Sequence, residues 1–128
     1  MHIVAHGVDL VQCARIGAIW KRHGAHFLDR VFTPAEQDYC LDGKLAETRL
    51  AGRFAAKEAV LKALGTGWRG GIEWTDIETL PDPLGKPVTT LRGESLQVAE
   101  RIGVTRFLVS ISHAGEYAIA SAIAVRDA

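Results

Sequence analysis

The segment 45–64 constrains the fold more than any other part of the sequence, because it has a helical pattern with two apolar sides. At about 100° per residue, large apolar side chains fall on one arc of this helix and alanines fall on another. The large residues are Leu50, Phe54, Leu61 and Leu64, and the small ones are Ala51, Ala55, Ala59 and Ala63. Gly65 follows in the position where a left-handed residue closes a helix. We therefore expect a long central helix that is buried on both sides.

Shorter patterns surround this helix without a regular alternation of strand and helix. Strands are predicted at 3–11, 72–80, 87–92, 107–113 and 117–125, with the last two forming a hairpin. Helices are predicted at 13–28, from the Thr33 to Glu36 capping sequence to about 42, and at 94–102. A glycine-rich connection is expected at 65–71. Strands gathered around one central helix favour an α+β fold, here a single domain over residues 1–128.

The composition excludes several classes of protein. Fifteen Lys and Arg residues balance fifteen Asp and Glu residues, so no global field would attract nucleic acid or an anionic membrane. No apolar run approaches the roughly 18 residues that a membrane span needs. Cys13 and Cys40 have no CxxC spacing, and no secretory signal precedes them, so reduced thiols are expected. The sequence predicts a cytoplasmic protein that binds neither nucleic acid nor membranes.

Four of the charged residues on the central helix are candidates for a functional site. Arg53 and Lys57 project within or beside the large apolar arc, whereas Glu58 and Lys62, four positions apart, lie together on its border with the alanines. One interpretation is an ordinary Glu58–Lys62 ion pair, with the heads of Arg53 and Lys57 reaching solvent. The other is a site in which an acid holds a cation and the bases hold phosphates. The spacing alone does not choose between them.

Other candidate residues are ambiguous when taken one at a time. Asp9 lies near the end of the first predicted strand. A carboxylate at such a position is more often a cap or turn residue than a metal ligand. A histidine in such a hairpin is usually structural. His113 would need to face a cleft to act as a base or as a hydrogen-bond donor to phosphate. Four histidines lie early in the chain, at His2, His6, His23 and His26. No cysteines or acidic residues lie near them in the sequence to complete a zinc site.

Taken together, the motifs form a recognisable order along the chain. They are Gly7-Val8-Asp9-Leu10-Val11 with Arg15-Ile16, Arg53-Phe54-Ala55-Ala56-Lys57-Glu58-Ala59 with Lys62-Ala63, Gly65-Thr66-Gly67, Gly85-Lys86-Pro87, and Ser110-Ile111-Ser112-His113 with Tyr117-Ala118. This order, from about residue 3 to residue 125, resembles the holo-acyl-carrier-protein synthases. These are the small bacterial phosphopantetheinyl transferases. The aspartate motif and the Lys-Glu-Ala-x-x-x-Lys helix are the most specific parts of the resemblance.

The resemblance implies that the protein transfers phosphopantetheine from coenzyme A to a serine of apo-acyl carrier protein and releases adenosine bisphosphate. Asp9 and Glu58 would bind Mg²⁺ together with the diphosphate of coenzyme A, and Lys62 would contact phosphate oxygens. These three residues are the predicted catalytic set. Residues expected around the adenosine and its phosphates are Arg53, Lys57, Lys62, Gly85, Lys86, Pro87 and His113. The general base stays open among Glu58, a metal-bound water and His113.

The resemblance also implies partners. The small members of this family are homotrimers with active sites between subunits, which would give a central helix the burial that it needs on both sides. Arg15 matches the arginine on the helix that docks the carrier protein, and Arg22 extends the same basic face. The resemblance also implies an acidic acyl carrier protein, so opposite charges would meet on this helix. A binding module that lost turnover and a purely structural oligomer are the alternatives. The presence of Asp9 and Glu58 argues against the first, and Arg53 and Lys57 would lack partners in the second.

Overall fold

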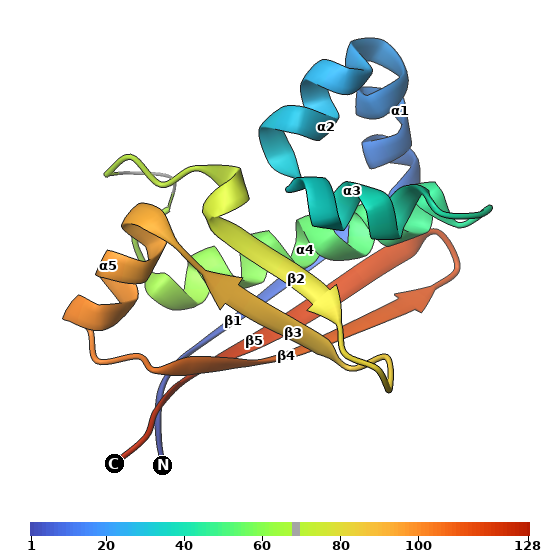
Figure 1. Cartoon of the computed structure of the whole chain (residues 1–128). Coiled ribbons are helices and arrows are strands. Elements are labelled where there is room, and N and C mark those ends of the chain that lie inside the picture. Colours follow the sequence, from blue (N-terminus) through green and yellow to red (C-terminus); the bar gives the residue numbers. More distant parts are fainter. Residues whose placement is uncertain (68–69) are drawn as a thin grey trace.

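The central helix of the fold is α4 (Ala46–Leu64), which ends at Gly65 in a left-handed conformation with φ 81°. In the computed structural model, which describes residues 1–67 and 70–128, α4 lies between two layers (Figure 1). Residues 68–69, in the middle of the predicted connection 65–71, lie outside the described residues. The other helices are α1 (Cys13–His23), α2 (Ala25–Val31), α3 (Pro34–Leu41), α5 (Gly93–Arg101) and the short 3₁₀ turn η1 (Trp74–Asp76).

The strands form two antiparallel sheets. One has three strands in the order β1-β5-β4, and the other is the hairpin of β2 and β3. Their bounds are β1 (His2–Gln12), β2 (Ile77–Pro81), β3 (Pro87–Leu91), β4 (Arg106–Ala114) and β5 (Tyr117–Arg126). The three-stranded sheet covers one side of α4, while β2 and α3 pack against the other (Figure 1). The α+β prediction is confirmed.

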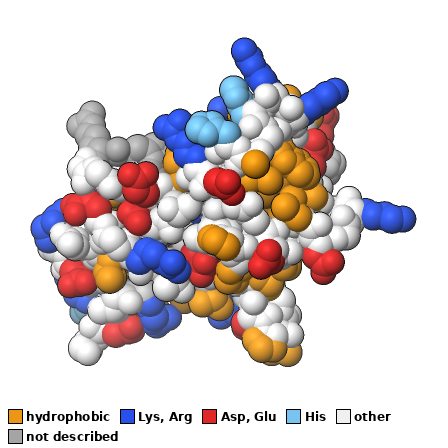
Figure 2. Space-filling model, turned by 45° about the horizontal axis from the view of Figure 1, so that its top comes forward, with side chains coloured by type: hydrophobic (Ala, Val, Ile, Leu, Met, Phe, Trp, Pro, Cys, Tyr) orange, Lys and Arg blue, Asp and Glu red, His pale blue; other side chains and the backbone are white. Residues whose placement is uncertain are grey.

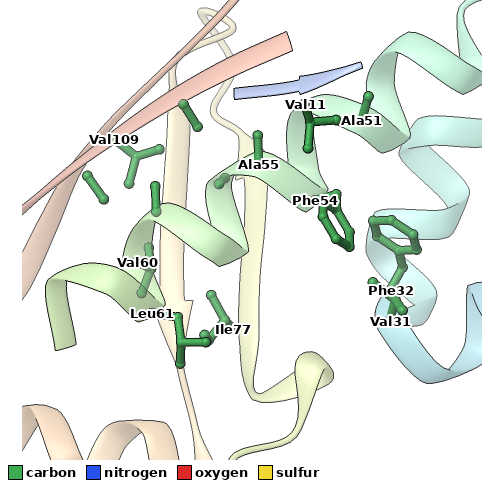
Figure 3. Packing of buried hydrophobic residues seen from close by; sticks show 14 of the residues in the cluster. Val11, Val31, Phe32, Ala51, Phe54, Ala55, Val60, Leu61, Ile77 and Val109 are labelled. Atoms are coloured by element: carbon green, nitrogen blue, oxygen red, sulfur yellow. The ribbon is translucent and has the colours of Figure 1, made fainter. Parts of the chain in front are cut away.

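The two apolar arcs of α4 face these two layers. In Figure 3, Ala51 and Ala55 point toward Val11 of β1, whereas Phe54 and Leu61 point toward the layer that holds Phe32 and Ile77. The facing side of β5 is also small, with a buried alanine at every second position: Ala118, Ala120, Ala122 and Ala124. Small residues on both surfaces let the helix lie close to the sheet.

The backbones of β1 and α4 approach each other closely at Gly7. A Cβ atom at this position would lie 1.9 Å from the carbonyl oxygen of Ala59 and 2.9 Å from the amide nitrogen of Ala63. Only glycine fits where the backbone of a strand touches the backbone of a helix. Because side chains alternate along a strand, Asp9 points to the same side as Gly7, toward α4.

Most of the predicted elements are confirmed, and two differ. Thr33 and Glu36 form the reciprocal capping box at the start of α3. The predicted helix 13–28 is instead two helices, because Gly24 adopts a positive φ of 57° between α1 and α2. The predicted strand 72–80 begins later, since the 3₁₀ turn η1 precedes β2. Along the described parts of the chain, no helix combines the length and the apolar character that crossing a bilayer requires.

The outer face of the three-stranded sheet is apolar and open in the single chain. Val8, Leu10 and Ile119 point away from α4, and they are 46%, 60% and 40% exposed. Val8 and Leu10 alternate with the inward-facing residues of β1, and Ile119 lies opposite Leu10 on β5. No element of the described chain covers this face in Figure 1.

Candidate functional site

Asp9 and Lys62 meet where β1 crosses the C-terminal half of α4. The Nζ atom of Lys62 donates to Oδ1 of Asp9 at 3.1 Å and to the carbonyl oxygen of Val8 at 2.9 Å. The Lys62 side chain is 54% exposed and the Asp9 side chain 16%. Among the described residues, Lys62 therefore forms its ion pair with Asp9, 53 positions away in the sequence, and not with Glu58 as the helical spacing suggested.

Glu58 and Lys62 line a shallow surface hollow with Leu61, Gly65 and Gly67. We call this region, together with Asp9, the carboxylate end of α4. Its oxygen donors are the type that Mg²⁺ prefers, and Mg²⁺ is commonly held by one or two carboxylates together with substrate phosphates. Within residues 1–67 and 70–128, no group of three or more His, Cys, Asp or Glu side chains could hold a metal ion. Asp9 and Glu58 both lie beside Lys62, and their oxygen donors fit a divalent ion that a phosphate ligand helps to coordinate.

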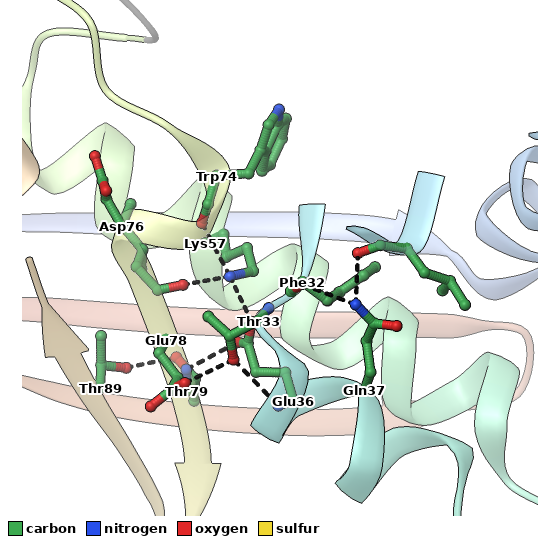
Figure 4. Close-up of polar contacts among 12 residues, drawn as sticks. Phe32, Thr33, Glu36, Gln37, Lys57, Trp74, Asp76, Glu78, Thr79 and Thr89 are labelled. Carbon is green, nitrogen blue, oxygen red and sulfur yellow. Dashed lines mark hydrogen bonds and ion pairs between the residues drawn. The ribbon is translucent and has the colours of Figure 1, made fainter. Parts of the chain in front are cut away.

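Lys57 lies on another side of α4 and is fully buried. Its Nζ atom forms an ion pair with Oε1 of Glu36 at 2.8 Å and donates to the carbonyl oxygens of Trp74, at 3.0 Å, and Ile77 (Figure 4). A lysine ammonium has three donors, and these three acceptors use all of them. The expected contact between Lys57 and the phosphates of coenzyme A is therefore not available in this chain, and the side chain does not reach solvent.

Burial also changes the electrostatics of Lys57. Desolvation lowers the pKa of its ammonium group, and the adjacent carboxylate of Glu36 opposes this effect. Glu36 was not singled out from the sequence beyond its capping role. The capping box was its only sequence signal, because the lysine that it pairs with lies on another helix.

Arg53 is also buried, at 5% exposure, and does not extend to solvent as one interpretation had it. Its guanidinium lies over the ring of Tyr39 at 4.5 Å, and Arg49 lies over the same ring at 4.7 Å. The Nε atom of Arg53 has no hydrogen-bond partner among the described residues. Lys57 is fully paired and Arg53 stacks on Tyr39, so both side chains would have partners in a purely structural oligomer as well.

His113 packs against the first half of α4, beside Thr48 and Gly52, rather than near Glu58. Its Nε2 atom lies 3.1 Å from the carbonyl oxygen of Thr48, in the first turns of α4. From Thr48 to Glu58 the helix rises by about 15 Å at 1.5 Å per residue. We call the region of Arg49, Arg53 and His113 the arginine end of α4. One chain does not bring His113 to the carboxylate end.

The predicted turn at Gly85, Lys86 and Pro87 forms the tip of the β2–β3 hairpin. The Oδ1 atom of Asp82 accepts from the amides of Leu84 and Lys86, both at 2.9 Å, and Gly85 has φ 88°. These contacts hold an exposed turn. In Figure 1 the hairpin tip lies toward the end of α4 opposite Gly65. It therefore lies apart from the carboxylate end of the same chain.

Basic side chains gather over α1 and α2, where Figure 2 shows Lys, Arg and His along the top of the molecule. Arg15, Lys21 and Arg22 of α1 are exposed, as the sequence predicted. A groove between these helices adds residues that the sequence did not single out for binding, because their convergence depends on the break at Gly24. It is lined by Ile19, His23, His26, Phe27, Arg30, Val31 and Trp74.

Comparisons with known proteins agree with this architecture. The model of the 4'-phosphopantetheinyl transferase superfamily matches residues 5–122. The holo-[acyl-carrier-protein] synthase of Desulforudis audaxviator is 50% identical over 123 residues, which cover 96% of this chain and 93% of that protein. The crystal structure of the Neisseria meningitidis holo-[acyl-carrier-protein] synthase is 35% identical, with a TM-score of 0.87 and coverage of 98% of this chain and 100% of that one.

A third similar protein was solved with a ligand. The Helicobacter pylori holo-[acyl-carrier-protein] synthase, in complex with coenzyme A, is 33% identical, with a TM-score of 0.82 and coverage of 94% of this chain and 99% of that one. The chain described here belongs to the 4'-phosphopantetheinyl transferase superfamily. Its relatives named above are all holo-[acyl-carrier-protein] synthases.

Proposed function

We propose that this protein is an enzyme that transfers phosphopantetheine from coenzyme A to a serine of apo-acyl carrier protein. The products are holo-acyl carrier protein and adenosine bisphosphate. The observation that carries this proposal is the convergence of Asp9, Glu58 and Lys62 at one end of α4, in a chain whose solved relative binds coenzyme A. Carboxylates and an exposed ammonium are the groups that a metal-assisted phosphoryl transfer requires.

The reaction breaks the bond between the pantetheine-bearing phosphorus and the oxygen that leads to the adenosine bisphosphate. The serine hydroxyl attacks this phosphorus, so no covalent enzyme intermediate is needed. The exposed ammonium of Lys62 stabilises the negative charge that develops on the phosphate oxygens. Asp9 and Glu58 would hold Mg²⁺, which, when bound, neutralises phosphate charge and orients the diphosphate. Glu58 lies at the carboxylate end and could accept the serine proton there, whereas His113 could do so only from a second copy.

We further propose that the active site forms between copies of a homotrimer. His113 and the turn at 85–87 lie away from the carboxylate end of their own chain, so a second copy would have to supply them to one coenzyme A molecule. The open apolar face around Val8, Leu10 and Ile119 supports assembly, because burying such a face against another copy removes apolar surface from water, which is favourable. Light scattering tests the trimer, and a single 13.9 kDa species at micromolar concentration would contradict it.

The carrier protein is proposed to dock on α1, where Arg15 and Arg22 are exposed. An acidic partner would be attracted to this surface and oriented on it. The free thiols of Cys13 and Cys40 are consistent with work in the reducing cytoplasm, which we propose as the location.

The decisive assay incubates the purified protein with apo-acyl carrier protein, coenzyme A and Mg²⁺ and measures the intact mass of the carrier protein. We expect a mass gain of one phosphopantetheine group, and no gain when coenzyme A is omitted. Binding of coenzyme A and carrier protein without any mass gain would instead identify a binding module that has lost turnover.

A further inference from the structure

Lys57 and Glu36 form a completely satisfied buried pair, although the lysine belongs to the motif that marks the family. Both side chains have 0% exposure. The three donors of Lys57 go to Glu36, Trp74 and Ile77, so its ammonium has no donor left for a ligand. A buried charge this well paired has a role within the protein, since it cannot contact coenzyme A directly.

The carboxylate of Glu36 is equally engaged. Its Oε1 atom accepts from the amide of Thr33 at 2.9 Å as well as from Lys57, and its Oε2 atom accepts from the amide of Thr79 at 2.9 Å. Thr33 in turn donates from its hydroxyl to Glu78 at 2.6 Å (Figure 4). The pair thus joins α3, α4 and β2 in one network.

The contacts of Lys57 have a specific geometric consequence. The connection that leaves α4 begins at Gly65, whose amide donates to the carbonyl of Leu61 at 3.0 Å, and Gly65 and Gly67 line the hollow beside Glu58 and Lys62. The same connection ends at η1, where Lys57 holds the carbonyl of Trp74. Lys57 therefore holds η1, which follows this connection in the sequence, against α4 at a position one residue before Glu58.

We propose that Lys57 and Glu36 act as a positioning pair for coenzyme A binding. The pair fixes η1 and β2 against α4 and thereby sets where the backbone of Gly65 and Gly67 lies over the carboxylate end. Glycines have no side-chain contacts of their own to hold them, so the placement of this backbone depends on how its ends are anchored. This inference rests on the proposed location of the coenzyme A site.

The test measures coenzyme A affinity by titration calorimetry and the KM values for coenzyme A and carrier protein in four proteins. They are the wild type, Lys57→Met, Glu36→Gln and the double variant Lys57→Met/Glu36→Gln. Glutamine keeps an oxygen acceptor for the amide of Thr33 or Thr79 while it removes the charge. The double variant contains no unpaired buried charge, so it keeps the test valid if a single variant does not fold. The matched control is the exposed pair Arg106–Asp127, tested as Arg106→Met/Asp127→Asn.

We expect the Kd and KM for coenzyme A to rise about tenfold or more in each folded variant, with the same factor from either side of the pair. The double variant should be no worse than the singles, and the KM for carrier protein should stay within twofold. If Lys57→Met weakens coenzyme A binding and Glu36→Gln does not, Lys57 touches the ligand and the inference is wrong. Unchanged affinity in the folded double variant would make the pair purely structural. Absence of transfer in the wild type would instead contradict the proposed function.

Discussion

Two lysines of α4, Lys57 and Lys62, belong to the same sequence motif and have opposite surroundings. Lys57 is completely buried and donates to three protein acceptors. Lys62 is 54% exposed and forms an ion pair with Asp9 at the edge of a hollow. The difference arises because 57 and 62 lie on different sides of the helix, one facing β2 and α3 and the other facing β1. The comparison shows that two lysines of one motif differ in burial and pairing, and under the proposed function only Lys62 is placed to act on phosphate.

The largest expected effect is a loss of catalysis when the carboxylate end of α4 is changed. Asp9→Ala and Glu58→Ala should each abolish detectable Mg²⁺-dependent transfer, because Mg²⁺ requires hard oxygen ligands. The intact-mass assay measures transfer, and circular dichroism checks that each variant is folded. Turnover close to that of the wild type in either folded variant would remove Asp9 or Glu58 from the metal site.

The next effect is a difference in protein stability between variants of Lys57 and Lys62. Lys57→Met should lower the free energy of unfolding by about 3–5 kcal/mol, because it leaves Glu36 as an uncompensated buried charge. Lys62→Met should change it by less than about 1 kcal/mol, since the exposed pair with Asp9 is screened by water. Urea unfolding monitored by tryptophan fluorescence measures both values. Equal losses would contradict the contrast in burial.

A smaller effect concerns the exposed charges of α1. Arg15→Glu should raise the KM for carrier protein about tenfold, which corresponds to about 1.4 kcal/mol, and should leave the KM for coenzyme A nearly unchanged. Added salt should also weaken carrier binding by the wild type. An equal rise in both KM values, or no rise, would mean that the carrier docks elsewhere.

A pH-dependent effect probes the buried side through Cys40, which lies near the network of Glu36 and Lys57. Burial is the main cause that raises the pKa of this thiol from 9.0 to about 12. Between these values the folded state keeps a proton that the unfolded state releases, so this thiol makes the protein less stable as the pH rises. The difference in unfolding free energy between wild type and Cys40→Ala should therefore shrink from pH 9 to 12. The change should be at most about 1.4 kcal/mol per pH unit. A constant difference would show that the thiol is not shielded.

The parts of the fold that local chemistry determines could be predicted from the sequence. The capping box of Thr33 and Glu36, the end of α4 at Gly65 and the two apolar arcs each depend on residues within a few positions of one another. The break between α1 and α2 was missed, because a single glycine within a helical pattern is compatible with either outcome.

For the candidate site, the sequence indicated residue types but not the contacts that those residues make. Helical spacing placed Glu58 beside Lys62 but could not show that Lys62 pairs with Asp9, which comes from a different strand. It also could not show that Lys57 faces Glu36, because that contact depends on how α3 packs against α4. Long-range contacts of this kind follow from the packing of elements, which no local pattern records.

The measurement that tests the division between the two lysines most directly is kcat at saturating coenzyme A. The account predicts that Lys62→Met lowers kcat about 100-fold, because its charge acts on the phosphate in the transition state. The folded Lys57→Met/Glu36→Gln variant should keep kcat within a few-fold of wild type once coenzyme A is saturating. If the double variant loses as much kcat as Lys62→Met, or if Lys62→Met retains the wild-type kcat, the assignment of a reactive and a positioning lysine is wrong.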